Sequence, residues 1–321
     1  MGLWVPGLRD VYRARRVVER VLGRTPLLYS RPLSRLLGAE VYLKYECVLP
    51  TRAFKVRGMV YYVHARGDLG GGVVVASTGN FAQAAAYAAG LVGVRCVVVM
   101  PEGVSRVKVE AVKALGGEVV FHGRVFDEAL DYARWYAERE GLTFVHSVNE
   151  PLLYAGVGTM HLEVLEDLPD VEVVINPIGG GSGAGSAVIV YKTVDPSIRV
   201  VGVQAEGAPS VYLSLKRGEL VATGRADTRA EGLATSRTYE LAFKILHGRI
   251  DDVVLVSDGE MLEAARMLYE AERIIPELAG AAPLAAALKL REGLRGRRVV
   301  LMVTGCNVDG ETLSAIAGSK G

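Results

Sequence analysis

The chain has 321 residues, of which half are hydrophobic and 23% are charged. This composition excludes a disordered chain, and the length is sufficient for about two domains with a core that needs no disulfide or metal. The chain has 37 basic and 36 acidic residues, so its net charge is only +1. It therefore has no large overall positive charge that would attract nucleic acid. No apolar run approaches the roughly 18 residues that span a bilayer. We therefore expect a cytoplasmic protein with no nucleic-acid and no membrane partner.

The first expected element is a helix over residues 10–22, where arginines and valines recur at helical spacing. A basic amphipathic helix can bind a membrane surface or nucleic acid. The valines also fit the underside of an ordinary surface helix, and we predict that role.

Short Val- and Ile-rich runs alternate with helical patterns along the rest of the chain. The runs are 73–75, 96–100, 171–175 and 299–303, and the helical patterns include 81–89, 107–115, 128–140 and a long stretch over 260–290. Continuous apolar runs are typical of parallel strands that are buried on both faces. The alternation predicts an α/β fold with two doubly wound domains and mainly parallel sheets. We expect a large domain of residues 1–70 and 148–321, and a smaller, mobile, substrate-binding domain of residues 71–147.

The cysteines and histidines show no ligand pattern. Cys47, Cys96 and Cys306 are odd in number and far apart, so we predict three reduced thiols. The five histidines have no paired metal-binding spacing, and we expect no metal from them.

A glycine-rich segment, GGGSGAG at residues 179–185, directly follows an apolar run and opens a helical pattern. Such a turn exposes backbone N–H groups at a helix N-terminus, which favours binding of an anion such as phosphate. The spacing matches neither a Walker A loop nor the dinucleotide fingerprint. Taken alone, the segment also fits a simple tight turn.

Three more segments carry polar groups beside apolar runs. Lys55 follows Phe54, residues 76–81 (ASTGNF) follow the 73–75 run, and residues 304–309 (TGCNVD) follow the last one. Each has an ordinary explanation, namely a surface lysine, a helix N-cap and a turn. The ends of parallel strands are also where α/β sheets bind ligands.

Together these four segments, in this order, resemble the fold type II family of pyridoxal-phosphate (PLP) enzymes. The family includes threonine and serine dehydratases, serine racemase, threonine synthase and cysteine synthase, and the resemblance covers residues 23–309. It implies a tryptophan-synthase-β-like PLP fold, PLP as the cofactor, an amino acid as the substrate, and a homodimer.

The resemblance also assigns cofactor-binding residues. Lys55 is the Schiff-base lysine and the base that removes the Cα proton, Asn80 bonds the phenolic oxygen of PLP, and Thr304 bonds its pyridine nitrogen. The residues implied for the phosphate are Gly179, Gly180, Gly181, Ser182 and Gly183.

The turn at residues 77–81 is implied to bind the substrate. Its members are Ser77, Thr78, Gly79, Asn80 and Phe81. Thr78 is also a candidate catalytic group, because a base on the second face of the substrate would come from this turn.

The implied reaction is β-elimination. A neutral hydroxyl such as that of Thr304 cannot hold the pyridine nitrogen protonated, which favours expulsion of a β-substituent over transamination. Residues 54–58 (FKVRG) are similar to dehydratases, so the leading interpretation is an ammonia-lyase acting on L-threonine or L-serine. The 76–80 turn is more like threonine synthase acting on O-phospho-L-homoserine. A cysteine synthase, a serine racemase and a non-catalytic small-molecule sensor are further candidates.

Some relatives in the family bind a cation beside the phosphate loop. Gln204 and Ser210 occupy the corresponding ligand positions here and lack a carboxylate, so we predict no metal. Glu206 is expected to be a surface or substrate-gate residue, with a cation ligand as the alternative.

Overall fold

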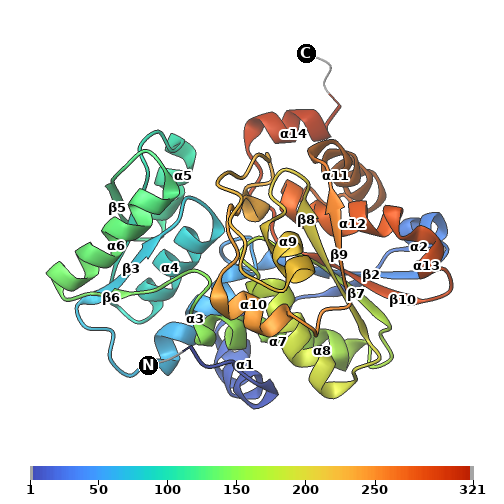
Figure 1. Ribbon diagram of the computed structural model, residues 1–321, viewed down its shortest axis with the longest axis horizontal. Helices are drawn as coiled ribbons and strands as arrows, with labels where there is room; N and C mark the ends of the chain where they lie inside the picture. The colour runs from blue at the N-terminus through green and yellow to red at the C-terminus, as the bar shows by residue number, and fades with distance from the viewer. Residues whose placement is uncertain (1–2, 319–321) are drawn as a thin grey trace.

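Two sheets form two lobes in the computed structural model, which describes residues 3–318. The large lobe contains a six-stranded sheet of order β1-β2-β10-β7-β8-β9, and the small lobe contains a four-stranded sheet of order β5-β4-β3-β6. Figure 1 shows the small lobe at the left, with α3 and α7 running between the lobes. Within residues 3–318, no helix is long and apolar enough to cross a membrane.

The elements of the large lobe come from both ends of the chain. Its strands are β1 (Leu27–Tyr29), β2 (Glu40–Tyr45), β7 (Val173–Pro177), β8 (Arg199–Ala205), β9 (Asp252–Val256) and β10 (Arg298–Val303). Its helices are α1 (Leu8–Leu22), α2 (Arg31–Leu37), η1 (Glu46–Val48), α3 (Lys55–Ala65), α7 (Pro151–Asp167), α8 (Ser182–Val194), α9 (Ser210–Arg217), η2 (Glu231–Leu233), α10 (Glu240–Leu246), α11 (Asp258–Glu272), α12 (Leu278–Lys289), α13 (Arg291–Leu294) and α14 (Gly310–Ile316).

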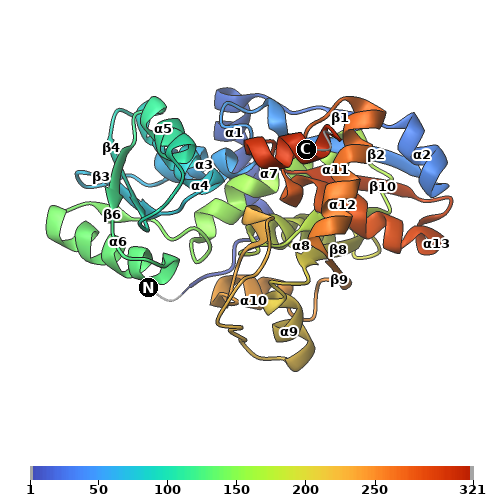
Figure 2. The same ribbon diagram turned by 90° about the horizontal axis from the view of Figure 1, so that it is seen from above.

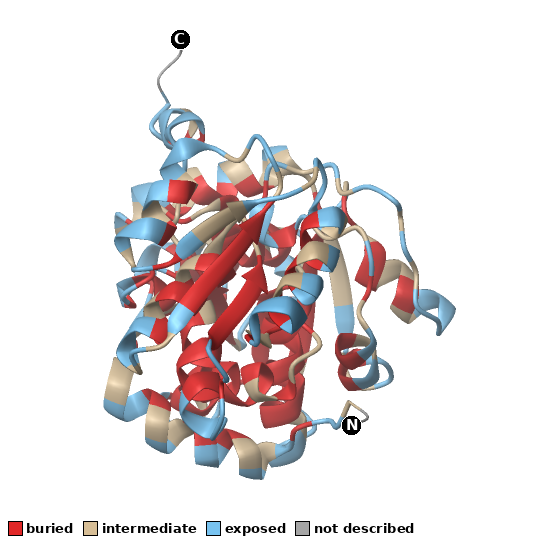
Figure 3. Ribbon diagram, turned by 90° about the vertical axis from the view of Figure 1, so that its left-hand side faces the viewer, coloured by how far each residue is buried: buried red, intermediate tan, exposed pale blue. Residues whose placement is uncertain are grey.

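The small lobe is continuous in sequence. It consists of β3 (Gly72–Ala76), α4 (Asn80–Leu91), β4 (Arg95–Met100), α5 (Arg106–Ala114), β5 (Glu118–Phe121), α6 (Phe126–Glu140) and β6 (Thr143–Phe144). In Figure 3, which views this lobe from outside, the central strands are coloured as buried and the outer helix faces as exposed.

The predicted α/β class with mainly parallel sheets is confirmed. All strand pairs are parallel except β1 with β2. Alternate residues of β10 belong to cores on opposite faces, with Val299, Leu301 and Val303 on the α12 side and Val300 and Met302 on the α8 side. Burial of both faces explains why the run is continuously apolar.

Two predicted elements differ in extent. The strand predicted over residues 171–175 begins at Val173, two residues later than expected. The 260–290 stretch is two helices, because α11 ends at Glu272, its C-cap Arg273 has a left-handed backbone (φ 60°), and Pro276 follows before α12. A left-handed residue and a nearby proline are ordinary helix stops.

The predicted surface helix over 10–22 is α1, and it lies against α7 and α3. Its buried residues are Val11, Ala14 and Val18, which form the expected apolar underside.

A buried cluster of charged residues connects β2, η1, α3 and α7. Arg57 donates to both carboxylates of Glu46 and Glu163, and Lys44 donates to Glu163 at 2.6 Å. All four residues are at most 3% exposed. Their charges cancel, and Thr25 supplies a further hydrogen bond to Glu46.

The prediction of three reduced thiols was wrong for two of them. Cys47 and Cys306 form a disulfide with Cα atoms 5.4 Å apart, although 259 positions separate them in sequence. Parallel pairing of β2 with β10 places the ends of these strands side by side, which brings the two thiols together. Cys96 is a free, buried cysteine, and burial raises the pKa of its thiol to about 12.

Cys306→Ser is expected to lower the stability toward unfolding, by at most about 5 kcal/mol in the chain-entropy account of a long loop. Thiol titration of the denatured parent chain should give one free thiol without reductant and three after reduction. Urea unfolding of the parent with and without reductant checks the stability effect, and Cys96→Ser serves as the control. Three free thiols without reductant would contradict the disulfide.

Two ion pairs connect the lobes. Lys108 on α5 pairs with Glu231 on η2, and Asp127 on α6 pairs with Arg237. Seen from above, the chain between α9 and α10 extends with these helices from the same side of the large lobe (Figure 2). The small lobe therefore contacts the large lobe through charged side chains as well as through α3.

Candidate active site

Lys55 is the first residue of α3, at the junction of the two lobes. Its Nζ donates a hydrogen bond of 2.8 Å to Oγ of Ser182, the first residue of α8. The lysine and the glycine-rich segment, which are 127 positions apart, are thus brought together. Burial lowers the pKa of the Lys55 ammonium to about 8.

The segment before Lys55 is attached to the end of β10. Ala53 pairs with Gly305 as an isolated antiparallel bridge, and the Phe54 N–H donates to the Thr304 carbonyl at 3.0 Å. The Cys306 N–H donates to the Arg52 carbonyl at 2.9 Å. Thr304 is 2% exposed and lies next to the chain that presents Lys55.

The glycines of the glycine-rich segment have no room for side chains. A Cβ on Gly179 would lie 2.1 Å from the Gly232 carbonyl oxygen, and one on Gly180 would lie 2.3 Å from Val148. Gly181 has a left-handed φ of 104°. The chain therefore turns tightly into the 13-residue helix α8, and the N-terminus of a helix favours an anion.

The turn at residues 77–80 connects β3 to α4. Ser77 Oγ accepts from the Gly79 N–H at 3.3 Å, and Ser77, Thr78, Gly79 and Asn80 are all of intermediate exposure. Phe81 is only 4% exposed and packs in the apolar core of the small lobe. The residues of this turn that remain accessible are therefore the polar ones.

Asn80 is held by two side chains from the large lobe. Its Nδ2 donates to Oε1 of Glu277 at 2.8 Å, and its Oδ1 accepts from Nδ2 of Asn307 at 2.7 Å. Burial raises the pKa of Glu277 to about 7. Neither Glu277 nor Asn307 has a role predicted from the sequence. For Glu277, the available signal was an acid directly before an Ala-rich, apolar helical pattern.

The place where some relatives of the resembled family bind a cation, and where we predict none, has neutral groups and an ion pair. Gln204 Oε1 accepts from the Tyr212 N–H, and Ser210 Oγ donates to the Thr235 carbonyl. Glu206 lies 3.5 Å from Lys289. Within residues 3–318 there is no group of three or more His, Cys, Asp or Glu side chains that could hold a metal.

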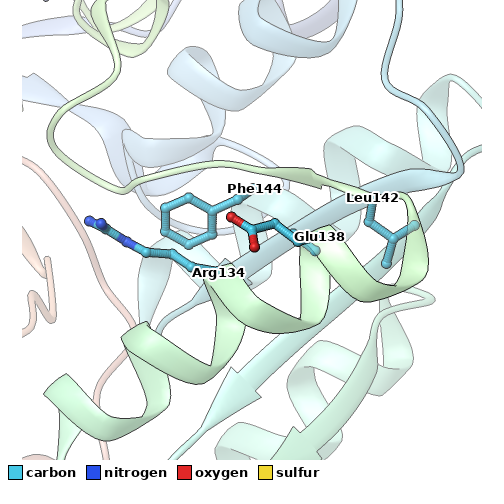
Figure 4. Close-up of a pocket in the computed structure, with 5 residues that line it drawn as sticks. Arg134, Glu138, Leu142 and Phe144 are labelled. Carbon is cyan, nitrogen blue, oxygen red and sulfur yellow. The ribbon is translucent and has the colours of Figure 1, made fainter.

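Two surface cavities lie away from these residues. One, of about 320 Å³, is lined by Arg134, Ala137, Glu138, Leu142 and Phe144, with Arg134 extended beside the Phe144 ring (Figure 4). The other, of about 380 Å³, lies between α6 and the chain around Tyr239 and includes His146. Neither is lined by a predicted site residue.

The residues present fit PLP. The fit rests on a glycine turn that a Cβ would fill, at a helix N-terminus suited to a phosphate, with a lysine amine hydrogen-bonded to its first helical residue. Asn80 offers an amide N–H, and Thr304 offers a hydroxyl. These groups supply an amine for the Schiff base of PLP, a turn for its phosphate, a donor for its phenolic oxygen and a partner for its pyridine nitrogen.

Comparison with known proteins agrees with this geometry. Residues 18–305 match the family described as pyridoxal-phosphate dependent enzymes, and the chain belongs to that family.

Individual members of known function are also similar. The L-threonine ammonia-lyase of Thermotoga maritima is 37% identical over 94% of this chain and 76% of its own length. Among solved structures, the T.th. threonine deaminase is 36% identical, with a TM-score of 0.89 over 95% of this chain and 99% of that one. Maize serine racemase is 29% identical, with a TM-score of 0.92 over 97% and 96%.

Proposed function

We propose that this chain is a PLP-dependent ammonia-lyase that converts L-threonine, L-serine or both to 2-oxobutyrate or pyruvate and ammonia. The observation that carries the proposal is the contact of Lys55 Nζ with Ser182 at the head of the glycine turn. This contact supports a role for Lys55 as a reactive amine beside an anion-binding turn. The names of the relatives support an ammonia-lyase.

In this proposal the accessible polar groups of residues 77–80 bind the substrate carboxylate and fix the orientation of the Cα–H bond. PLP, when bound, supplies the electron sink that makes this bond acidic. Lys55 Nζ takes the Cα proton, and its lowered pKa keeps a useful fraction of the amine neutral near pH 7. Loss of the Cα proton and the β-hydroxyl together releases one water, and hydrolysis of the released enamine consumes one water. The balanced products are the 2-oxo acid and ammonia.

Assay of the PLP-loaded protein with L-threonine tests the proposal, with 2-oxobutyrate, ammonia and inorganic phosphate measured separately. Equal amounts of 2-oxobutyrate and ammonia, without phosphate, are the expected result. Phosphate release from O-phospho-L-homoserine with formation of threonine would instead support threonine synthase. Formation of D-serine from L-serine as the main product would support a racemase.

We also propose the domain division of residues 1–70 with 148–321 and 71–147, a homodimer, and a cytoplasmic location. Containment of β3 to β6 within 71–147 supports the division. The Cys47–Cys306 disulfide is unusual for a cytoplasmic protein, because most cytosols keep thiols reduced. It is compatible with the cytoplasm of a hyperthermophile, where protein disulfides are common. We propose no metal requirement, which an assay in chelator tests.

A further inference from the structure

A chain of hydrogen bonds between side chains runs along one side of the candidate cofactor site. It begins at the Thr51 carbonyl, which accepts from Nδ2 of Asn307 at 2.9 Å. Asn307 Nδ2 also donates to Oδ1 of Asn80, and Asn80 Nδ2 donates to Oε1 of Glu277. Three elements of the fold thus meet at one amide, the Asn80 side chain on α4.

The direction of this chain is fixed at its ends. A backbone carbonyl can only accept, so the Asn307 group that faces Thr51 must be its amino group. The same amino group faces Asn80, which must therefore present its oxygen there. At the other end an ionised carboxylate can only accept, so Asn80 must present its amino group to Glu277. In the reverse orientation, the amino group of Asn80 would face the amino group of Asn307, and the oxygen of Asn80 would face the carboxylate of Glu277.

We infer that Glu277 is a positioning residue that holds the Asn80 amide so that its second N–H points to the cofactor as a donor. Asn80 Nδ2 has two hydrogens and Glu277 takes one of them. The inference rests on the proposed function, in which Asn80 bonds the phenolic oxygen of PLP. That oxygen needs a donor when it is ionised.

The surroundings fix the carboxyl group in place. A Cβ on Gly305 would lie 2.7 Å from Oε1 and 3.1 Å from Oε2 of Glu277, so the carboxyl group lies directly over this glycine. The Glu277 N–H donates to the Gly305 carbonyl at 3.1 Å. Glu277 therefore moves with the strand end that also carries Thr304.

The orienting effect depends on the charge of Glu277. When protonated, the carboxyl group can donate as well as accept, so it tolerates either orientation of Asn80. Burial raises its pKa to about 7, and Glu231 on η2 contributes to the shift. Glu231 is itself paired with Lys108 on α5, while α4 and the loop after β10 present the neutral groups Asn80, Gly305 and Asn307. Above pH 7 the donor orientation of Asn80 is thus enforced from both ends of the chain, and below pH 7 it is held from the Asn307 end alone.

The test is PLP binding to the apoprotein, followed by absorbance at pH 6 and pH 8, in the parent and in Glu277→Gln. Glutamine keeps an acceptor and adds a donor, so it imitates the protonated acid at every pH. We expect equal affinity for the two proteins at pH 6 and about tenfold weaker binding to Glu277→Gln at pH 8, because a hydrogen bond to a charged acceptor is there replaced by one to a neutral acceptor. Lys55 and the PLP phosphate also titrate, but they do so in both proteins, so their effects cancel in the ratio of the two PLP affinities.

Glu263→Gln is the matched control, because it makes the same change on the exposed side of α11, where the side chain is 63% exposed. It should bind PLP as the parent does at both pH values. Asn307→Ala removes the other anchor and should weaken PLP binding at both. A ratio for Glu277→Gln that is the same at pH 6 and pH 8 would overturn the inference, as would unchanged binding in Asn307→Ala.

Failure of the inference and failure of the proposed function are distinguishable. A parent that shows the pH-dependent ratio but forms no 2-oxo acid supports the role of Glu277 and contradicts the ammonia-lyase. A parent that forms 2-oxobutyrate while the ratio stays constant supports the ammonia-lyase and contradicts the role of Glu277.

Discussion

Lys55→Ala is expected to remove the yellow absorbance of protein-bound PLP and to lower 2-oxobutyrate formation by about 10³-fold or more, since the same amine holds the cofactor and moves the Cα proton. The variant should fold. Lys55 contributes its hydrogen bond to Ser182, and burial of its charge is unfavourable. Absorbance after addition of PLP and a 2-oxo acid assay with L-threonine check the result.

The stability of this variant also has a predicted pH dependence. The pKa of Lys55 falls from 10.5 to about 8 on folding, so the folded chain binds fewer protons than the unfolded chain between these values. The stability of the parent apoprotein relative to that of Lys55→Ala should therefore rise as pH goes from 8 to 10.5, because groups common to both proteins, such as Cys96, cancel in the difference. Lys113→Ala, at an exposed position on α5, is the control for both measurements. Full activity in Lys55→Ala would contradict the assignment.

Arg57→Met is expected to cost about 3–5 kcal/mol of unfolding free energy, because it leaves two buried carboxylates with only Lys44 as counter-charge. Arg57 is fully buried and donates to Glu46 and Glu163. Urea unfolding of the apoprotein at pH 7 measures the loss. Arg13→Met on α1, where the side chain is 59% exposed, should change the unfolding free energy by less than about 1 kcal/mol.

The acid limb of the stability curve provides a second measurement for Arg57. Arg57 and Lys44 lower the pKa of Glu163 from 4.5 to about 2 against the opposing effect of burial. In the parent this carboxylate contributes stability above pH 4.5 that is lost as the pH falls toward 2. Arg57→Met should show a smaller loss over that range. An unchanged acid limb would mean that the arginine does not control this carboxylate.

Local patterns were sufficient to predict most of the fold. Each strand of the two sheet centres is buried on both faces, so its sequence is a continuous apolar run that can be recognised without a partner. Glycine turns and N-caps mark where helices begin. The extent of β7 and the break between α11 and α12 depend on pairing and backbone angles, which short windows determine less well.

The candidate site was predictable only in part. Lys55, the glycine turn and residues 77–80 each have a local signature, and the resemblance joined them. Glu277 and Asn307 act on Asn80 from 197 and 227 positions away, so no window in the sequence contains the contact. The Cys47–Cys306 pair was mispredicted for the same reason, since only the pairing of β2 with β10 brings the thiols together.

The disulfide has a topological consequence. It closes the polypeptide into a covalent ring from Cys47 to Cys306, with two shorter tails outside. The whole small lobe lies within the ring, and so does the connection that precedes it, residues 67–71 (GDLGG). One proteolytic cut at that connection would open the ring without releasing a fragment, because the disulfide still joins the two pieces. On a denaturing gel the cut chain would therefore run as one species without reductant and as two fragments with it.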